Sequence, residues 1–398
     1  MHLTPDLQGG LRTRSAVASP PATAVAGREV PRRARLERVP TAIVYCEGEF
    51  ARIDGKTANG LVRHSEAYRI LSVIDSRHAG RDSGLVLDEK ANRIPILRDL
   101  ESAVNDAPLV PDVLIYGAAP STGRLSPADR EVVLDAIGLG MNIVSGLHEH
   151  LCDDEEIAAR ATAKGVSLRD VRKPKPGKDM RLFDGSVADV DAIRIAVLGT
   201  DCAIGKRTTA TILARALNDA GVRTVLVGTG QTGLMQGARY GVAMDATPPQ
   251  FCCGELEGAI VAADRNERPD VILIEGQGAL SHPAFCTSAF ILRGGQPDAV
   301  ILQHAPRRRY RCDFPAMAMP DLIEEIALIE AFAATRVVGV TLNHEEMDGD
   351  EIDEAIARLE RRTMLPATDA LSRPAADLAK IVFDAFPELP RRSAEAAE

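Results

Sequence analysis

A glycine-bracketed segment near the middle of the chain combines the residue types that hold a phosphate group. Its residues are Gly199, Thr200, Asp201, Cys202, Ala203, Ile204, Gly205, Lys206, Arg207 and Thr208. Glycines let backbone N–H groups curl around an anion, and a helix that starts behind the second glycine adds a partial positive charge. Lys206 supplies a point charge for the outer phosphate oxygens. We expect these residues and Thr209 to bind the phosphates of a cofactor, with a purely structural turn as the alternative.

This segment departs from the common GxxxxGK[ST] loop in two ways. One more residue separates the glycines, and Arg207 stands where Ser or Thr usually follows the lysine. The usual hydroxyl binds Mg²⁺, so either Thr208 or Thr209 takes over here or the site holds phosphate without a metal. The departure weakens the case for nucleotide hydrolysis more than the case for phosphate binding, and we predict no resident metal ion.

Two candidate catalytic residues lie at the ends of apolar runs. Glu275 follows the run Val271–Ile274, and it could act as a general base in a transferase or as a Mg²⁺ ligand in a kinase-like enzyme. A solvated glutamate at a strand end is the alternative. His304 follows another apolar run, and histidine is the natural base near neutral pH.

An arginine-rich segment, Arg307–Arg311, follows His304. A guanidinium can donate two parallel hydrogen bonds to a carboxylate. We expect Arg307 and Arg309 to bind the carboxylates of an anionic substrate, with a solvated basic surface as the alternative.

Four further features could contribute to a site. Gln231 and Thr232 follow an expected strand, where open α/β sheets bind ligands, and we expect them to contact substrate. A second glycine-bracketed loop, Gly117–Gly123, could also meet substrate. Cys202 could form an acyl-enzyme, because a thiol near a helix N-terminus is acidified, but a small residue that fills the loop is the favoured interpretation. His282 is a weaker candidate base.

Alternating strands and helices position these residues. Apolar runs typical of buried strands cover 41–46, 69–74, 112–116, 142–145, 193–198, 224–228, 271–274, 299–303 and 337–342. Helical patterns cover 58–68, 127–139, 208–220, 255–264, 322–334 and 350–362. Strands that alternate with helices indicate parallel sheets, so the fold class is α/β.

The length of 398 residues favours two domains. The Pro/Lys/Gly stretch Lys173–Lys178 is the best candidate for the boundary between them. We expect a disordered tail over residues 1–38, a first domain over 39–180 and a second domain over 186–390.

Composition excludes several classes of function. The formal net charge of −10 argues against a nucleic-acid or anionic-membrane binder, and no apolar run is long enough to span a membrane. The 7 cysteines show no repeated CxxC spacing, which suggests reduced thiols and a cytoplasmic location. We expect a small-molecule enzyme that forms a homo-oligomer.

The second half of the chain resembles dethiobiotin synthetase and related P-loop proteins. The loop Gly199–Lys206 is similar to their glycine–five–glycine loop, and Glu275-Gly-Gln-Gly278 is similar to their strand ending in Glu-Gly. The run Val337–Asn343 resembles their strand whose final asparagine meets the adenine base. The resemblance implies a doubly wound P-loop domain and a cofactor-binding role for Asn343.

A closer resemblance extends over about residues 41 to 390. The loop through Thr209, together with Gly230–Gly233, Glu275–Gly278 and Leu302–Ala305, is similar to a bacterial P-loop family long known only as a domain of unknown function. Arg207 is part of that family's version of the loop. The family places a Rossmann-like domain before the P-loop domain, and its members include D-glutamate N-acetyltransferases.

This resemblance implies an N-acetyltransferase that uses acetyl-CoA as co-substrate and D-glutamate as amine acceptor. A loop evolved for nucleotide phosphates can hold the diphosphate of acetyl-CoA. The first alternative is a dethiobiotin-synthetase-like kinase or ligase that uses ATP with Mg²⁺ on a small carboxylic acid. The second is a nucleotide-sensing switch protein without catalytic activity.

Overall fold

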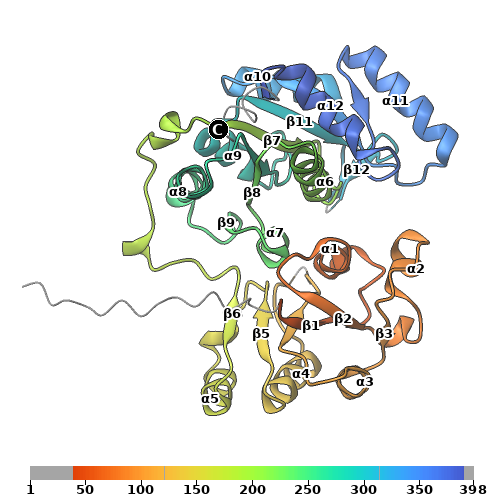
Figure 1. Ribbon diagram of the computed structural model, residues 1–398, viewed down its shortest axis with the longest axis vertical. Coiled ribbons are helices and arrows are strands. Elements are labelled where there is room, and N and C mark those ends of the chain that lie inside the picture. The colour runs from red at the N-terminus through yellow and green to blue at the C-terminus, as the bar shows by residue number, and fades with distance from the viewer. Residues whose placement is uncertain (1–38, 121, 313, 390–398) are drawn as a thin grey trace, which may run out of the picture. The chain divides into compact units, whose positions relative to one another are not determined.

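Two parallel sheets, each flanked by helices, make up the part of the chain that the computed structural model describes, residues 39–120, 122–312 and 314–389 (Figure 1). The tail predicted over residues 1–38 lies outside the described residues. The expected α/β fold is confirmed. Within the described ranges, no helix is both long enough and apolar enough to cross a membrane.

The first sheet is six-stranded, with the order β3-β2-β1-β4-β5-β6. Its strands are β1 (Thr41–Tyr45), β2 (Arg69–Ile74), β3 (Ile96–Leu97), β4 (Val113–Tyr116), β5 (Asn142–Ser145) and β6 (Leu168–Asp170). Its helices are α1 (Lys56–His64), α2 (Ser83–Asp88), α3 (Leu100–Asp106), α4 (Pro127–Gly138) and α5 (Glu155–Lys164). The strand order reverses between β1 and β4, as in Rossmann folds.

The second sheet is seven-stranded, with the order β15-β14-β11-β7-β10-β8-β9. Its strands are β7 (Ile193–Gly199), β8 (Thr224–Gly228), β9 (Tyr240–Gly241), β10 (Val271–Glu275), β11 (Ala299–His304), β14 (Val337–Leu342) and β15 (Ala367–Thr368). A separate antiparallel hairpin comprises β12 (Tyr310–Arg311) and β13 (Phe314–Ala318). Because β7 lies between β10 and β11, the residues that follow these three strands meet at one edge of the sheet.

Helices cover both faces of the second sheet. They are α6 (Lys206–Asp219), α7 (Gln231–Gln236), α8 (Pro249–Glu267), α9 (Thr287–Gly295), α10 (Leu322–Phe332), α11 (Gly349–Thr363) and α12 (Ala375–Ala385). Helices α6 and α12 pack on one face through residues such as Leu213 and Leu378. Helices α8 to α11 pack on the other through residues such as Ile260 and Ile352.

The predicted strands agree with the structure to within a residue at each end, whereas the helices vary more. Helix α4 begins after the N-cap Ser126, which forms a capping box with Asp129. Helix α8 is longer than predicted, and α6 begins at Lys206 rather than at Thr208. Helix α1 ends at His64, several residues before the predicted end.

Candidate phosphate-binding site

The glycine-bracketed loop joins the central strand β7 to helix α6. Gly205 is the N-cap of α6 and has a φ of +98°, a left-handed conformation that favours glycine. A Cβ atom on Gly199 would lie 2.8 Å from the Cδ1 atom of Ile204 and 3.1 Å from the carbonyl oxygen of Gln303. The two glycines therefore let the loop fold tightly over the end of the sheet, as a phosphate-binding loop must.

Lys206, in the first turn of α6, folds back over this loop. Its side chain is buried, and its Nζ donates a hydrogen bond to the carbonyl oxygen of Asp201. Burial lowers the pKa of Lys206, while the nearby Cys202, Asp201 and Glu275 oppose that shift. A buried ammonium next to helix amides that have no partner within the helix suits an anionic ligand.

Two arginines hold the loop from the side of the β12–β13 hairpin, and neither belongs to the predicted pair. The Nη1 of Arg308 donates to the Oδ2 of Asp201 at 2.9 Å and to the carbonyl oxygen of Cys202 at 2.8 Å. Arg311 is buried and donates to the hydroxyl of Ser281 at 3.0 Å and to the carbonyl oxygen of Thr200 at 3.4 Å. These side chains brace the loop backbone.

The two arginines predicted to bind substrate, Arg307 and Arg309, do not contact the loop, and their substrate-binding role stays a prediction. Both side chains are exposed, and Arg307 pairs with the exposed Glu351 on α11. Arg308 and Arg311 instead lie against the loop, as their hydrogen bonds to Asp201 and Thr200 show. The sequence alone does not show which of these four arginines face the loop and which face solvent.

Gln303, which the sequence analysis did not select, supports the loop from below. Its backbone carbonyl accepts a hydrogen bond from the amide of Thr200 at 3.0 Å. Its side-chain Oε1 accepts from the hydroxyl of Thr209 at 2.6 Å and from that of Thr341. The hydroxyl of Thr209 is therefore engaged beneath the loop. The one sequence feature that could have pointed to Gln303 is its polar side chain near the end of an otherwise apolar strand.

Arg207 turns away from the sheet toward helix α7. Its Nη1 donates to the side-chain Oε1 of Gln236, whose Nε2 donates to the carbonyl oxygen of Gly60 on α1. Burial lowers the pKa of Arg207, and the charge of Glu275 opposes this effect. A guanidinium therefore occupies the position of the usual metal-binding hydroxyl, and the hydroxyl of Thr209 is engaged by Gln303.

Glu275, at the end of β10, is 3% exposed. Its Oε2 accepts a hydrogen bond from the amide of Thr229 at 3.0 Å. Burial raises the pKa of Glu275, while Arg207 and the amides of Thr229 and Gly230 lower it. The structure thus places this predicted catalytic residue beside Arg207 at the same sheet edge as the loop.

His304, at the end of β11, contacts the loop directly. Its Nδ1 lies 3.0 Å from the hydroxyl oxygen of Thr200. Burial lowers the pKa of His304 to about 4, with Arg362 adding to the effect and Asp321 opposing it. The imidazole is therefore neutral at pH 7, which is the form that can accept a proton.

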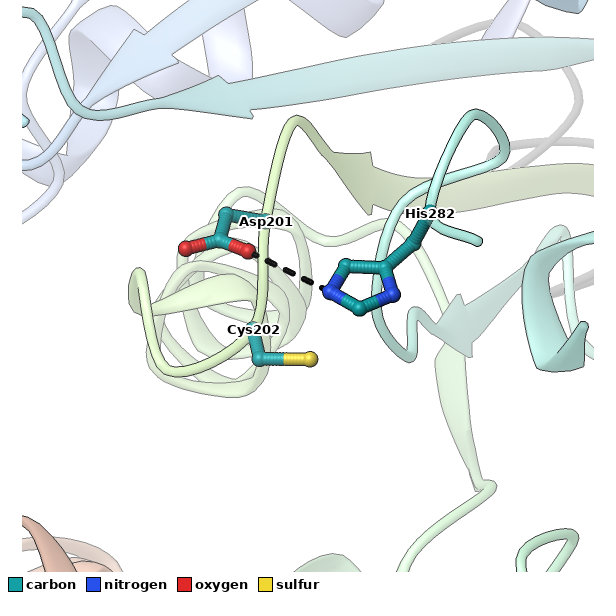
Figure 2. A group of neighbouring side chains, drawn as sticks. All are labelled: Asp201, Cys202 and His282. Atoms are coloured by element: carbon teal, nitrogen blue, oxygen red, sulfur yellow. Dashed lines mark ion pairs between the residues drawn. The ribbon is translucent and has the colours of Figure 1, made fainter. Parts of the chain in front are cut away.

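Asp201 and Cys202 form a small cluster with His282 (Figure 2). Figure 2 shows Asp201 and Cys202 on the loop after β7 and His282 facing them from the segment after β10; the Nε2 of His282 lies 3.9 Å from the Oδ1 of Asp201. These groups offer metal-ligand atoms within 4.8 Å of one another. However, Arg308 already pairs with Asp201, and its guanidinium opposes a cation here.

The remaining predicted contacts lie in different surroundings. Thr232 is buried, with its hydroxyl 2.9 Å from that of Thr57 on α1. Gln231 is buried against Gly146. Both therefore pack between the sheets. The Oδ1 of Asn343 accepts from the amide of Glu345 at 2.9 Å, so its oxygen closes a turn beside the site.

A cavity of about 410 Å³ lies where the strand order of the first sheet reverses. The loop Gly117–Gly123 contributes to its wall. Its charged lining residues are Glu47, Glu49, Asp129 and Arg124. Because carboxylates outnumber the single arginine, this cavity does not suit a dicarboxylate.

Comparison with known families gives two adjoining matches. A profile described as the DUF1611 C-terminal P-loop domain, a domain of unknown function, matches residues 181–379. A second profile, described as the DUF1611 N-terminal Rossmann-like domain, matches residues 76–174.

Individual relatives agree with these matches. A D-glutamate N-acetyltransferase from Tritonibacter scottomollicae is 33% identical over 262 residues, which cover 64% of this chain and 76% of that protein. A protein of the same name from a Pseudoalteromonas species is 31% identical and covers 65% and 77%. The crystal structure of a DUF1611 family protein from Anabaena variabilis superimposes with a TM-score of 0.80 at 31% identity, over 87% of this chain and 99% of that one.

Proposed function

Because this chain belongs to the DUF1611 family, with its Rossmann-like and P-loop domains, we propose that it is an N-acetyltransferase that transfers the acetyl group of acetyl-CoA to the amino group of D-glutamate. The observation that carries the proposal is the match to two D-glutamate N-acetyltransferases over about three quarters of their length. The loop geometry supports the proposal, because a phosphate-binding loop suits the phosphates of acetyl-CoA. Aminolysis of its thioester needs no metal ion.

In this proposal the P-loop holds the diphosphate of acetyl-CoA. The loop amides and the N-terminus of α6 provide hydrogen-bond donors, and Lys206 provides the balancing charge. Gln303 and Arg308 keep the loop in shape from two sides. Asn343 lies beyond the neighbouring strand β14, and its amide NH₂ can donate to the adenine.

The ammonium group of the acceptor loses two protons in all: the base removes one to give the neutral amine, and the second leaves the nitrogen as the amide forms. The neutral amine attacks the thioester carbonyl, a C–N bond forms, the C–S bond breaks, and the CoA thiolate takes up a proton. His304 is the group we assign as the base, because its neutral imidazole lies against Thr200 at the end of the loop. Glu275 would serve instead as a buried counter-charge for Arg207 and Lys206.

The test is release of free CoA thiol from acetyl-CoA in the presence of EDTA. We expect release that depends on D-glutamate and survives chelation, with formation of N-acetyl-D-glutamate detected by mass spectrometry. In the Lys206→Ala variant, the rate of thiol release should no longer saturate with acetyl-CoA concentration, while the protein should remain folded. ADP production from ATP that stops on addition of EDTA, with no thiol release, would instead assign the protein to the ATP-dependent kinases or ligases.

A further inference from the structure

Arg207 occupies a position in the loop that usually belongs to a metal ligand. In P-loop nucleotide hydrolases the hydroxyl after the lysine and an acidic residue at a strand end together hold Mg²⁺. Here the residue after Lys206 carries a permanent positive charge, and the strand-end acid is Glu275. A cation, Arg207, therefore takes the place of the usual hydroxyl ligand, while the acidic position keeps a carboxylate, Glu275.

Helix α7 brings these two side chains together. A Cβ atom on Gly233 would lie 2.4 Å from the Oε2 of Glu275. Gln236, one turn further along α7, accepts the hydrogen bond from Arg207. Residues three apart lie on the same face of a helix, so the carboxylate and the guanidinium share one face of α7.

Contacts with the first sheet fix the guanidinium in this place. The Nε2 of Gln236 donates to the carbonyl oxygen of Gly60. Its backbone oxygen accepts from the amides of Glu66 at 2.7 Å and Ala67 at 3.0 Å. A Cβ atom on Gly60 would lie 2.4 Å from the Nη2 of Arg207, so the guanidinium packs directly against α1. The cation is therefore held in one position.

We propose that Arg207 determines the ligand specificity of this loop by supplying, as a fixed guanidinium beside Glu275, the positive charge that Mg²⁺ supplies in nucleotide-hydrolysing P-loop proteins. The loop then selects a diphosphate that arrives without a divalent metal. The identity of the natural ligand rests on the proposed function, whereas the metal independence of the site does not.

Two observations favour this role over that of a purely structural strut. The hydroxyl of Thr209 is bonded to Gln303 at 2.6 Å, so it is not directed at a metal. The carboxylate of Glu275 is 3% exposed and needs a nearby positive charge, because an unpaired buried carboxylate is costly. Removal of the guanidinium would leave that carboxylate and the phosphates facing each other, and a divalent cation could then enter.

The experiment measures binding of CoA and of ADP by calorimetry, in EDTA and again in Mg²⁺, for the wild type, Arg207→Ser and Arg215→Ser. Arg215 is the matched control, since it lies on the same helix and pairs with Glu66 at 3.3 Å, but its side chain is largely exposed. We expect the wild type and Arg215→Ser to bind both ligands equally with and without metal. Arg207→Ser should bind roughly tenfold to a hundredfold more weakly in EDTA, and Mg²⁺ should restore most of the loss.

The proposal is overturned if Arg207→Ser binds like the wild type in EDTA, if Mg²⁺ does not restore its affinity, or if the wild type itself requires Mg²⁺. Should Arg207→Ser fail to fold, Arg207→Lys decides the matter: it retains the charge and should remain independent of metal. Acetyl transfer to D-glutamate is assayed separately on the wild type. A protein that binds CoA without metal but transfers no acetyl group would refute the proposed function and leave the role of Arg207 intact.

Discussion

At the scale of single residues, the loop braces matter as much as the residues that face the ligand. Asp201, inside the loop, is fully buried and accepts hydrogen bonds from Arg308 at 2.9 Å and from the amide of Cys312 at 2.8 Å. An isolated buried carboxylate would be costly. The loop therefore depends on a cation contributed from beyond β11, more than a hundred residues away in the sequence.

We predict that Arg308→Ala weakens binding of acetyl-CoA roughly tenfold to a hundredfold, because charge-assisted hydrogen bonds contribute about 1.5–3 kcal/mol. Arg307→Ala is the matched control, because its side chain is exposed and pairs with Glu351 rather than with the loop, and it should bind like the wild type. Calorimetric titration of both variants provides the comparison. Equal losses in the two variants would contradict the distinction.

His304 should make the free energy of unfolding depend on pH between about 4 and 6.5. Its folded pKa of about 4 lies below its ordinary value of 6.5, so between these values the unfolded chain binds more protons than the folded one. The free energy of unfolding therefore rises with pH across this window, and the stability that His304 contributes is lost as the pH falls from 6.5 to 4.

We predict that His304→Asn makes the pH dependence of unfolding shallower in this range, by up to about 1.4 kcal/mol per pH unit. Urea unfolding at a series of pH values measures the slope. His64, whose pKa is also lowered to about 4 by burial, should keep part of the dependence in the variant. An unchanged slope would mean that His304 titrates normally in the folded protein.

At the scale of elements, apolar runs predicted the inner strands of both sheets, whereas the edge strands β3, β6, β9 and β15 and the hairpin strands β12 and β13 were not predicted. Contacts between elements decided these and other features. Helix α4 shows a local signal at each end, with Ser126 as N-cap and Gly140 just after its C-terminus. Helix α1 stops at His64 because the amides of Glu66 and Ala67 donate to the carbonyl oxygen of Gln236, a partner that no local pattern reveals. The same limitation explains why the sequence does not show which arginines of the cluster face the loop.

The segment that follows the predicted boundary is another case. Residues 181–187 run over helix α8 and are held by two buried carboxylates. The Oε1 of Glu255 accepts from the amide of Arg181 at 2.7 Å, and Glu257 accepts from the amides of Asp184 and Val187. The segment is therefore part of the packed structure.

We predict that Gly254→Ala destabilises the protein by about 1–3 kcal/mol, as overpacking does. A Cβ atom there would lie 2.3 to 2.5 Å from the backbone of Arg181–Phe183. Gly177→Ala is the control, because no atom lies within 4 Å of its added Cβ, and it should leave stability nearly unchanged. Urea unfolding measures both variants, and equal stability would show that the segment can move aside at no cost.

At the scale of the whole described structure, helix α7 follows strand β8 of the second sheet in the chain, but its side chains also pack into the core of the first sheet. Met235 is fully buried in the core cluster of the first sheet, together with Val44 and Val144. Its neighbour Gln236 carries the hydrogen bond from Arg207. A six-residue helix with only Leu234 and Met235 as large apolar residues gives no sign in the sequence of which core it enters, so this link could not be predicted from the residues alone.

We predict that Met235→Ala lowers the free energy of unfolding by about 2–5 kcal/mol, the usual cost of removing a buried methionine side chain, although the residue lies in the second half of the chain. The chain has no tryptophan, and three of its 5 tyrosines, Tyr45, Tyr68 and Tyr116, lie in the first half. Tyrosine fluorescence during urea unfolding therefore reports mainly on the first sheet, and its midpoint should shift in the variant. Met317→Ala, at a side chain 39% exposed, should leave that midpoint in place. If Met235→Ala shifted only signals from the second half, α7 would not stabilise the first core, and the contact between Gln236 and Gly60 would lose its support.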